Sequence, residues 1–213
     1  MTFYDYAIIF VRAVLYLFNG KPHYEGLENI PKDKVVIFAA THRSMLDPLY
    51  LAFAIYPLGK KVAFMGKDTL FENKVMAYIL PKLNVFPVNR EKTSPRTIKY
   101  AVKVMNEEGL SLGIFPSGTR YSTEIKGGTA FIQRLSKNDI VPVAIQPTLS
   151  KGDFFKRKTI KLAFGEPIAY DDTLKYDKVK MAEVDHLIAV RFDQLDQRLT
   201  PNYQYIPPVK KDK

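Results

Sequence analysis

Short runs of apolar and β-branched residues alternate with segments of helical character along most of the chain. We expect strands at residues 34–40, 60–65, 83–88, 110–115, 140–145 and 159–164. Helices are expected at residues 48–56, 73–80, 94–108, 129–135 and 172–199. Strands that alternate with helices are typical of α/β proteins, whose sheets contain parallel pairs. The sequence therefore predicts an α/β fold with a mixed, partly parallel sheet flanked by helices.

Prolines constrain the predicted position of one strand and the predicted end of one helix. Pro87 lies inside the strand expected at 83–88, and proline has no backbone N–H to donate to a neighbouring strand. This strand is therefore expected at an edge of the sheet, or to end there. The helix expected at 73–80 is predicted to stop before Pro81, because proline disrupts the helical hydrogen bonds.

The N-terminal segment 3–18 is the most apolar part of the chain, and on a helix Asp5, Arg12 and Asn19 would form one narrow polar stripe along it. Such a helix would span roughly 24 Å, less than the ~30 Å hydrocarbon core, with Arg12 near its middle. A positive cluster and a cleavage site, which mark signal peptides, are both missing. The helix is expected either to lie in the membrane interface or to pack on the core.

A chain of 213 residues suits one domain and is short for two. We therefore predict a short, amphipathic, membrane-associating helix at residues 1–20 and a single α/β domain at residues 21–213. The formal net charge of +10 is typical of proteins that bind nucleic acid, anionic lipid or phosphorylated ligands. Without cysteine there are no disulfides and no thiolate ligands, and the three histidines lack a spacing typical of metal sites. No metal is expected.

His42 follows the first expected strand by two residues, and Asp47 precedes Pro48 at the start of the next helix. On one continuous helix the two side chains would point ~140° apart, so they can meet only across a turn. A carboxylate that contacts one imidazole nitrogen leaves the other free to accept a proton. The alternative is that Asp47 is only a helix cap followed by a favourable first residue. Taken alone, this stretch favours the cap.

Two further polar segments follow expected strands, at the strand ends where α/β sheets bind ligands. Arg90 follows the strand at 83–88, and its guanidinium is suited to phosphate. After the strand at 110–115, the segment F115-P-S-G-T-R120 with Lys126 could hold an anion, or could be a tight turn with incidental polar residues. It lacks the spacing of a nucleotide-binding loop, so use of ATP or GTP is not indicated. Pro142 lies in the apolar strand at 140–145, which alone indicates only core.

Four segments in this order, T41-H-R-S-M-L-D47, V85-F-P-V-N-R90, F115-P-S-G-T-R120 and V141-P-V143, resemble the four ordered blocks of the glycerolipid acyltransferase family. Those blocks read N-H-x-S-x-x-D, an aromatic-centred block that ends in Arg, F-P-E-G-T-R-S and V-P-V. The resemblance is greatest to the bacterial 1-acylglycerol-3-phosphate acyltransferases and covers residues 20–168, approximately. Ser117 stands where the family usually has Glu, so the role of that carboxylate does not carry over.

The resemblance implies transfer of an acyl chain from a thioester to the 2-hydroxyl of 1-acylglycerol 3-phosphate, which forms phosphatidic acid in phospholipid biosynthesis. It implies His42 as the base and Asp47 as its orienting partner. The residues implied to bind substrate are Arg90, Ser117, Gly118, Thr119, Arg120 and Lys126. An acylated Ser117 is disfavoured, because no G-x-S-x-G motif surrounds it.

The resemblance further implies acyl carrier protein or coenzyme A thioesters as co-substrates, with no bound cofactor. The expected partners are lysophosphatidic acid and an anionic phospholipid membrane, not nucleic acid, and the expected location is the cytoplasmic face of the cell membrane as a peripheral or monotopic protein. The basic residues that could face anionic lipid, carrier protein or coenzyme A are Lys60, Lys61, Lys151, Lys156, Arg157 and Lys158. Two alternatives remain: a non-catalytic basic module that binds anionic lipid or nucleic acid, and a hydrolase of thioesters or phosphoesters that uses His42 and Asp47.

Overall fold

The computed structural model describes residues 1–89, 94–147 and 159–209. The α-helices are α1 (Phe3–Asn19), α2 (Asp47–Ile55), α3 (Lys74–Lys82), α4 (Pro95–Asn106), α5 (Gly128–Ser136) and α7 (Lys178–Leu199). Short 3-10 helices lie at Leu27–Asn29, Tyr56–Leu58 and Asp68–Phe71. The strands are β1 (His23–Glu25), β2 (Ile37–Ala40), β3 (Val62–Lys67), β4 (Val85–Val88), β5 (Ser111–Ile114), β6 (Ile140–Gln146) and β7 (Lys161–Phe164).

The strands form one seven-stranded sheet in the order β1-β7-β6-β2-β5-β3-β4. Strands β2 to β6 are parallel to their neighbours within this group, whereas β7 is antiparallel to β6 and β1 is parallel to β7. The predicted mixed, partly parallel α/β sheet is thus confirmed. All six predicted strands are present, and β4, which contains Pro87, lies at the sheet edge as expected. Strand β1 was not predicted, because its three residues, His-Tyr-Glu, form no apolar run.

Several helix boundaries differ from the prediction, and those of α3 and α7 have identifiable causes. Helix α3 continues through Pro81 to Lys82, and the turn after it is closed by N–H groups of Leu83 and Asn84 that donate to Leu80 and Pro81. A proline so close to the helix end removes only one helical hydrogen bond, which explains why the helix tolerates it. Helix α7 begins at Lys178, because the Asp177 side chain accepts the backbone N–H of Lys180 and caps the helix there.

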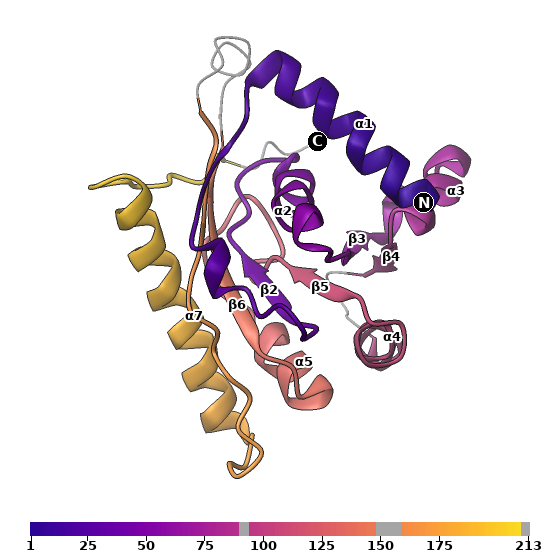
Figure 1. Cartoon of the computed structure of the whole chain (residues 1–213). Helices are drawn as coiled ribbons and strands as arrows, with labels where there is room; N and C mark the ends of the chain where they lie inside the picture. Colours follow the sequence, from indigo (N-terminus) through magenta and orange to yellow (C-terminus); the bar gives the residue numbers. More distant parts are fainter. Residues whose placement is uncertain (90–93, 148–158, 210–213) are drawn as a thin grey trace.

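Helices cover both faces of the sheet (Figure 1). On one side α1 and α2 pack against β2 and β6, and on the other side α4, α5 and α7 pack against the opposite face. Successive residues of β2 alternate between the two clusters, with Phe38 on the α2 side and Ile37 and Ala39 on the α5 side. All four residues of β2 are buried, as is typical of a parallel strand between two helical layers. The carboxyl ends of the neighbours β2 and β5 therefore open at the same edge of the sheet.

Helix α1 packs on the core through its polar stripe. Asp5 forms an ion pair with Lys61 at 2.8 Å and accepts a hydrogen bond from Tyr56 at 3.3 Å, and Asn19 donates to the Tyr50 hydroxyl at 3.2 Å. The hydrogen bond from Lys61 holds the pKa of the Asp5 carboxyl well below its usual range. Tyr4 and Ile8 are buried in the same contact. Of the two expected placements of this helix, packing on the core is therefore observed.

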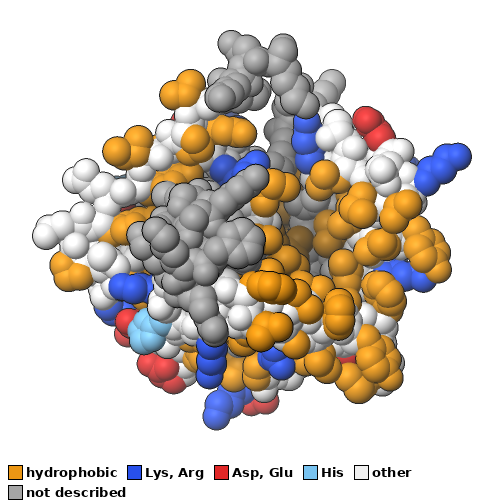
Figure 2. Space-filling model, turned by 90° about the horizontal axis from the view of Figure 1, so that it is seen from above, with side chains coloured by type: hydrophobic (Ala, Val, Ile, Leu, Met, Phe, Trp, Pro, Cys, Tyr) orange, Lys and Arg blue, Asp and Glu red, His pale blue; other side chains and the backbone are white. Residues whose placement is uncertain are grey.

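The opposite side of α1 exposes hydrophobic side chains. These are Phe3, Tyr6, Ile9, Phe10, Leu17 and Phe18. Helix α3 adds the exposed Val75, Met76 and Tyr78, and Lys82 at its end lies 5.6 Å from the ring of Phe3 on α1. Figure 2 shows a broad group of hydrophobic side chains on the half of the surface that these helices occupy. Among the helices that the structure describes, none is both long and apolar enough to cross a membrane.

Candidate active site

The turn between β2 and α2 brings His42 and Asp47 together. Nδ1 of His42 lies 3.1 Å from Oδ2 of Asp47. The Asp47 side chain is fully buried, and the His42 side chain is 9% exposed. The pairing across a turn that the spacing allowed is therefore present. A buried carboxylate in contact with one imidazole nitrogen is the arrangement that orients a general base.

Asp47 holds the turn rather than capping the helix. It is the first residue of α2, and its Oδ2 also accepts the backbone N–H groups of Arg43 at 2.6 Å and Ser44 at 2.7 Å. Both donors precede the helix, so the interpretation of Asp47 as a helix cap is wrong. One carboxylate oxygen thus fixes the turn and the imidazole at once. The other oxygen, Oδ1, is buried and bonds to no atom of the described residues.

The imidazole of His42 stacks on Phe115, which follows β5. The ring centroids are 4.2 Å apart with planes at 27°, and Phe115 in turn stacks on Phe64 at 6.1 Å and 10°. Gly113 makes room for this stack, because a Cβ there would lie 2.1 Å from the Phe64 ring. With Nδ1 bonded to Asp47, Nε2 has no hydrogen-bond partner in the part of the chain that the structure describes. This is the nitrogen that could accept a proton from a substrate.

The loop after β5 is a tight turn whose polar groups bond within the loop. Ser117 donates its hydroxyl to the carbonyl of Thr119 at 2.7 Å. Gly118 has a φ of 65°, and its N–H donates to the carbonyl of Phe115 at 2.8 Å. The Thr119 hydroxyl oxygen accepts the N–H of Tyr121 at 3.2 Å. Ser117 therefore does not supply the carboxylate chemistry of the family's Glu, and the N–H of Gly118, a residue implied to bind substrate, donates a hydrogen bond within the turn.

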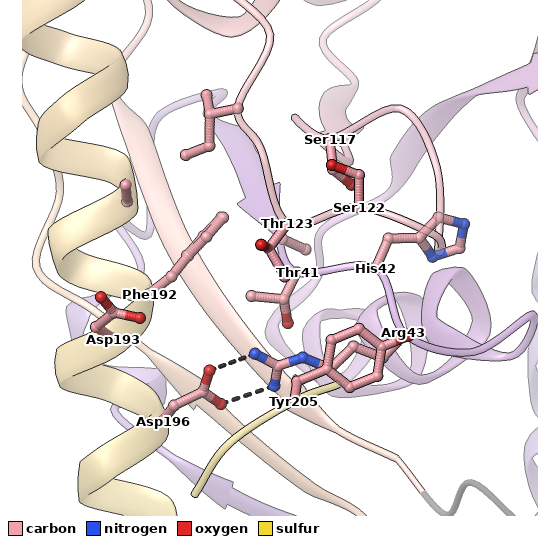
Figure 3. Close-up of a pocket in the computed structure, with 13 residues that line it drawn as sticks. Thr41, His42, Arg43, Ser117, Ser122, Thr123, Phe192, Asp193, Asp196 and Tyr205 are labelled. Carbon is pink, nitrogen blue, oxygen red and sulfur yellow. Dashed lines mark hydrogen bonds and ion pairs between the residues drawn. The ribbon is translucent and has the colours of Figure 1, made fainter. Parts of the chain in front are cut away.

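Two cavities adjoin this loop. One, of about 250 Å³, lies between the loop, the His42 turn and α7, and it is lined by His42, Ser117, Ser122, Thr123 and Tyr205 among others (Figure 3). The other cavity has a volume of about 210 Å³, and Gly118 and Lys126 are among the residues that line it. Most of its wall is apolar and comes from Met65, Val88, Ile98, Ile114, Phe115 and Ile132. Phe115 thus contacts His42 with its ring and also lines the apolar cavity.

The structure describes two of the three basic residues that are expected to bind substrate. Within residues 1–89, 94–147 and 159–209, no acidic side chain pairs with Arg120 or Lys126. The Arg120 guanidinium lies 5.8 Å from the ring centre of Tyr121. Arg90 lies outside the described residues, so its role in substrate binding stays a prediction. The described residues also contain no group of three His, Cys, Asp or Glu side chains that could hold a metal ion.

Three residues at the site were not predicted from the sequence. Arg43 follows His42, and its guanidinium forms an ion pair with Asp196 of α7. Tyr205 lines the cavity beside His42. Asp196 and Tyr205 lie far from the four motif segments in sequence, and no local pattern marks them as site residues.

Comparison with known proteins identifies the family. A family profile described as Acyltransferase matches residues 21–146. The chain is 35% identical over 196 residues to the 1-acyl-sn-glycerol-3-phosphate acyltransferase of Streptococcus pneumoniae, which covers 92% of this chain and 74% of that protein. It is 33% identical over 199 residues to the Bacillus subtilis protein of the same name. That alignment covers 92% of this chain and 98% of the Bacillus subtilis protein.

A solved structure agrees with the fold. The crystal structure of the 1-acyl-sn-glycerophosphate (LPA) acyltransferase from Thermotoga maritima superposes with a TM-score of 0.63 at 22% identity, over 92% of this chain and 83% of that chain. The profile match spans more than half of the chain, and two relatives exceed 30% identity over most of it. The chain therefore belongs to the acyltransferase family, among the 1-acyl-sn-glycerol-3-phosphate acyltransferases.

Proposed function

We propose that His42 is the general base of an enzyme that transfers an acyl chain from a thioester to the 2-hydroxyl of 1-acylglycerol 3-phosphate, forming phosphatidic acid. Two relatives are named 1-acyl-sn-glycerol-3-phosphate acyltransferase, a name that gives the acceptor and the group transferred. The observation that supports the role of His42 is the contact of 3.1 Å between its Nδ1 and the buried carboxylate of Asp47, in a residue that also lines a cavity.

The contact with Asp47 favours the tautomer with the proton on Nδ1, which leaves the lone pair of Nε2 for the acceptor hydroxyl. As that hydroxyl oxygen forms a bond to the thioester carbonyl carbon, its proton passes to Nε2. The C–S bond then breaks, and the leaving thiolate takes up the proton from Nε2, which returns the imidazole to its neutral form. During this step Asp47 stabilises the imidazolium. General acid–base catalysis of this kind contributes about 10²–10⁴-fold to a rate.

The acceptor phosphate needs cationic partners close to the base. Arg120 and Lys126 lie on the loop that follows β5, next to the strand that leads to His42, and no carboxylate in the described part of the chain neutralises them. We assign them to the phosphate, with Arg90 as a third cation. Their role is positioning, which converts a collision into a held geometry.

Arg120→Ala is expected to lower kcat/KM for 1-acylglycerol 3-phosphate by about 10- to 100-fold, because a hydrogen bond to a charged group contributes about 1.5–3 kcal/mol. The rate with 1-acylglycerol, which lacks the phosphate, should stay unchanged. Arg134→Ala removes the same charge from the exposed face of α5 and serves as the control. Equal losses with both acceptors, or with both variants, would remove Arg120 from the phosphate site.

The same assay tests the activity itself and the donor. Wild-type protein is incubated with 1-acylglycerol 3-phosphate and a labelled thioester of acyl carrier protein or coenzyme A, and labelled phosphatidic acid is measured. Comparison of the rates with the two donors, measured in parallel, shows which donor the enzyme uses. Release of free fatty acid that does not require the acceptor would instead indicate a hydrolase.

We also propose that residues 1–20 attach the single domain of residues 21–213 to the cytoplasmic face of the membrane. The exposed hydrophobic side of α1 supports this, because its polar stripe is already bonded to the protein. Lys61 pairs with Asp5, and Lys60 donates to the carbonyls of Lys32 and Lys34, so both ammonium groups have partners inside the protein. The remaining basic candidates, Lys151, Lys156, Arg157 and Lys158, lie outside the described residues.

The double variant Phe10→Asp and Leu17→Asp should reduce binding to vesicles of anionic phospholipid by at least ~100-fold, because each buried side chain of this kind contributes about 1.5–3 kcal/mol. Both side chains are about 70% exposed, so the fold should not change. Val179→Asp, an equally exposed position on α7, is the control. Co-sedimentation with vesicles measures the effect, and unchanged binding of the double variant would contradict the attachment.

A further inference from the structure

Arg43, the residue after His42, is anchored to the distant helix α7. Its Nη1 donates to Oδ1 of Asp196 at 2.7 Å, its Nη2 donates to the other carboxylate oxygen, and Nη1 also donates to the carbonyl of Ile145 at 2.8 Å. Figure 3 shows this two-pronged contact between the His42 turn and α7. Both side chains are buried, with 5% and 8% exposed. Gln146 donates a further hydrogen bond to Oδ1 of Asp196 at 3.1 Å.

The segment after α7 completes the contact. The rings of Tyr203 and Tyr205 each lie 5.1 Å from the Arg43 guanidinium. Such contacts between a cation and an aromatic ring are favourable, more so when water is excluded. The Tyr205 hydroxyl donates to the carbonyl of Arg120 at 3.0 Å. The chain end thus joins the His42 turn to the loop after β5.

The anchored residue is also the one whose backbone holds Asp47. The N–H of Arg43 donates to Oδ2 of Asp47 at 2.6 Å, on the same oxygen that contacts His42. Any shift of Arg43 would therefore move the acceptor that orients the imidazole. Buried ion pairs contribute little net stability, because desolvation offsets their attraction, but their geometry is strict. Catalysis is sensitive to small displacements, and a 1 Å misplacement can cost about 10²-fold.

We infer that Arg43, Asp196 and the ring of Tyr205 form a positioning group that fixes the His42–Asp47 pair. None of the three touches the reacting atoms in this role, and two of them lie beyond residue 146, where the family match ends. The inference rests on the proposed role of His42. It assigns a part in catalysis to a helix and a chain end that the motif segments do not include.

Asp196→Asn keeps the size of the side chain and removes its charge, and it is expected to lower kcat by about 10- to 100-fold with KM for both substrates nearly unchanged. Leu195→Ala is the matched control, since the neighbouring Leu195 is buried in a separate cluster with Ala144, Ala163 and Leu199. It should lower the melting temperature without changing kcat of the folded enzyme. Equal kcat losses in the two variants, or a wild-type kcat in Asp196→Asn, would overturn the inference.

Tyr205 gives a second test that does not disturb the core, because its side chain is only partly buried. Tyr205→Leu should lower kcat, and Tyr205→Phe, which keeps the ring over Arg43, should restore it. A wild-type kcat in Tyr205→Leu would remove this ring from the positioning group.

A readout independent of activity separates this inference from the proposed function. The Nδ1 proton of His42, assigned in an NMR spectrum by its loss in His42→Ala, should exchange faster with water in Asp196→Asn than in wild type or Leu195→Ala. An inactive wild type would count against the proposed function alone. An unchanged exchange rate in Asp196→Asn would count against the positioning group, whatever the activity.

Discussion

His42→Ala is expected to lower the rate of phosphatidic acid formation by about 10²–10⁴-fold while the protein remains folded. Among the described residues that line the cavity, only His42 combines a free ring nitrogen with a buried carboxylate partner. This combination suits it to remove the acceptor proton. Without it the hydroxyl must attack as a neutral, weak nucleophile. KM for 1-acylglycerol 3-phosphate should change little, because the phosphate contacts remain.

The measurement uses labelled thioester, saturating acceptor and equal amounts of folded enzyme, checked by circular dichroism. His186→Ala is the control, since His186 is exposed on α7 and lies on none of the cavities beside the motif loops. It should retain wild-type activity. Retention of most activity in His42→Ala would show that another group, or water, takes the proton, and the proposed mechanism would fail.

Replacing Asp47 should have an effect nearly as large, and two variants divide that effect into charge and structure. In Asp47→Ala the N–H groups of Arg43 and Ser44 lose their acceptor, and each unsatisfied buried group costs about 1–3 kcal/mol. Activity should fall by about 10²–10⁴-fold, together with the melting temperature. Asp47→Asn can keep its amide oxygen at the Oδ2 position, with the amide nitrogen at the unbonded Oδ1 position. It should retain most of the stability.

Asp47→Asn should still lose about 10- to 100-fold in kcat, because the imidazolium that forms during the reaction loses its charged partner. Thermal unfolding and steady-state kinetics on the same samples separate the two contributions. If Asp47→Asn were as active as wild type, the carboxylate charge would have no part in the chemistry, and Asp47 would be only a structural acceptor.

Local sequence patterns were sufficient for most of the fold and for the central pair of the site. Apolar runs located five of the six predicted strands, because a buried parallel strand needs no other signal, and alternating polar and apolar residues located the sixth, at residues 159–164. The turn between β2 and α2 was predictable for the same reason, since His42 and Asp47 fall at a boundary between two recognisable elements. Strand β1 was missed because its pairing with β7, and not its own composition, makes it a strand.

Contacts between distant segments could not be predicted. Arg43 and Asp196 are 153 positions apart, and each is unremarkable in its own segment. The periodicity of α1 located its polar stripe, but a stripe does not state which side faces the protein. Here the stripe faces inward, because Lys61, Tyr56 and Tyr50 provide partners for it. The partners of Ser117 and Gly118 depend on the backbone path of the loop after β5, which their side-chain types do not determine.

The strand order has a consequence for shortened versions of this protein. Strand β6 is the last element of the family match, yet it lies between β2 and β7, and all seven of its residues are buried. A fragment that ends at Gln146 would lack β7 and α7, which contact this strand. Its apolar residues and unpaired N–H and C=O groups would then face water as a new sheet edge, which favours aggregation through strand pairing between molecules. A soluble catalytic fragment must therefore extend well beyond residue 146, where the family match ends.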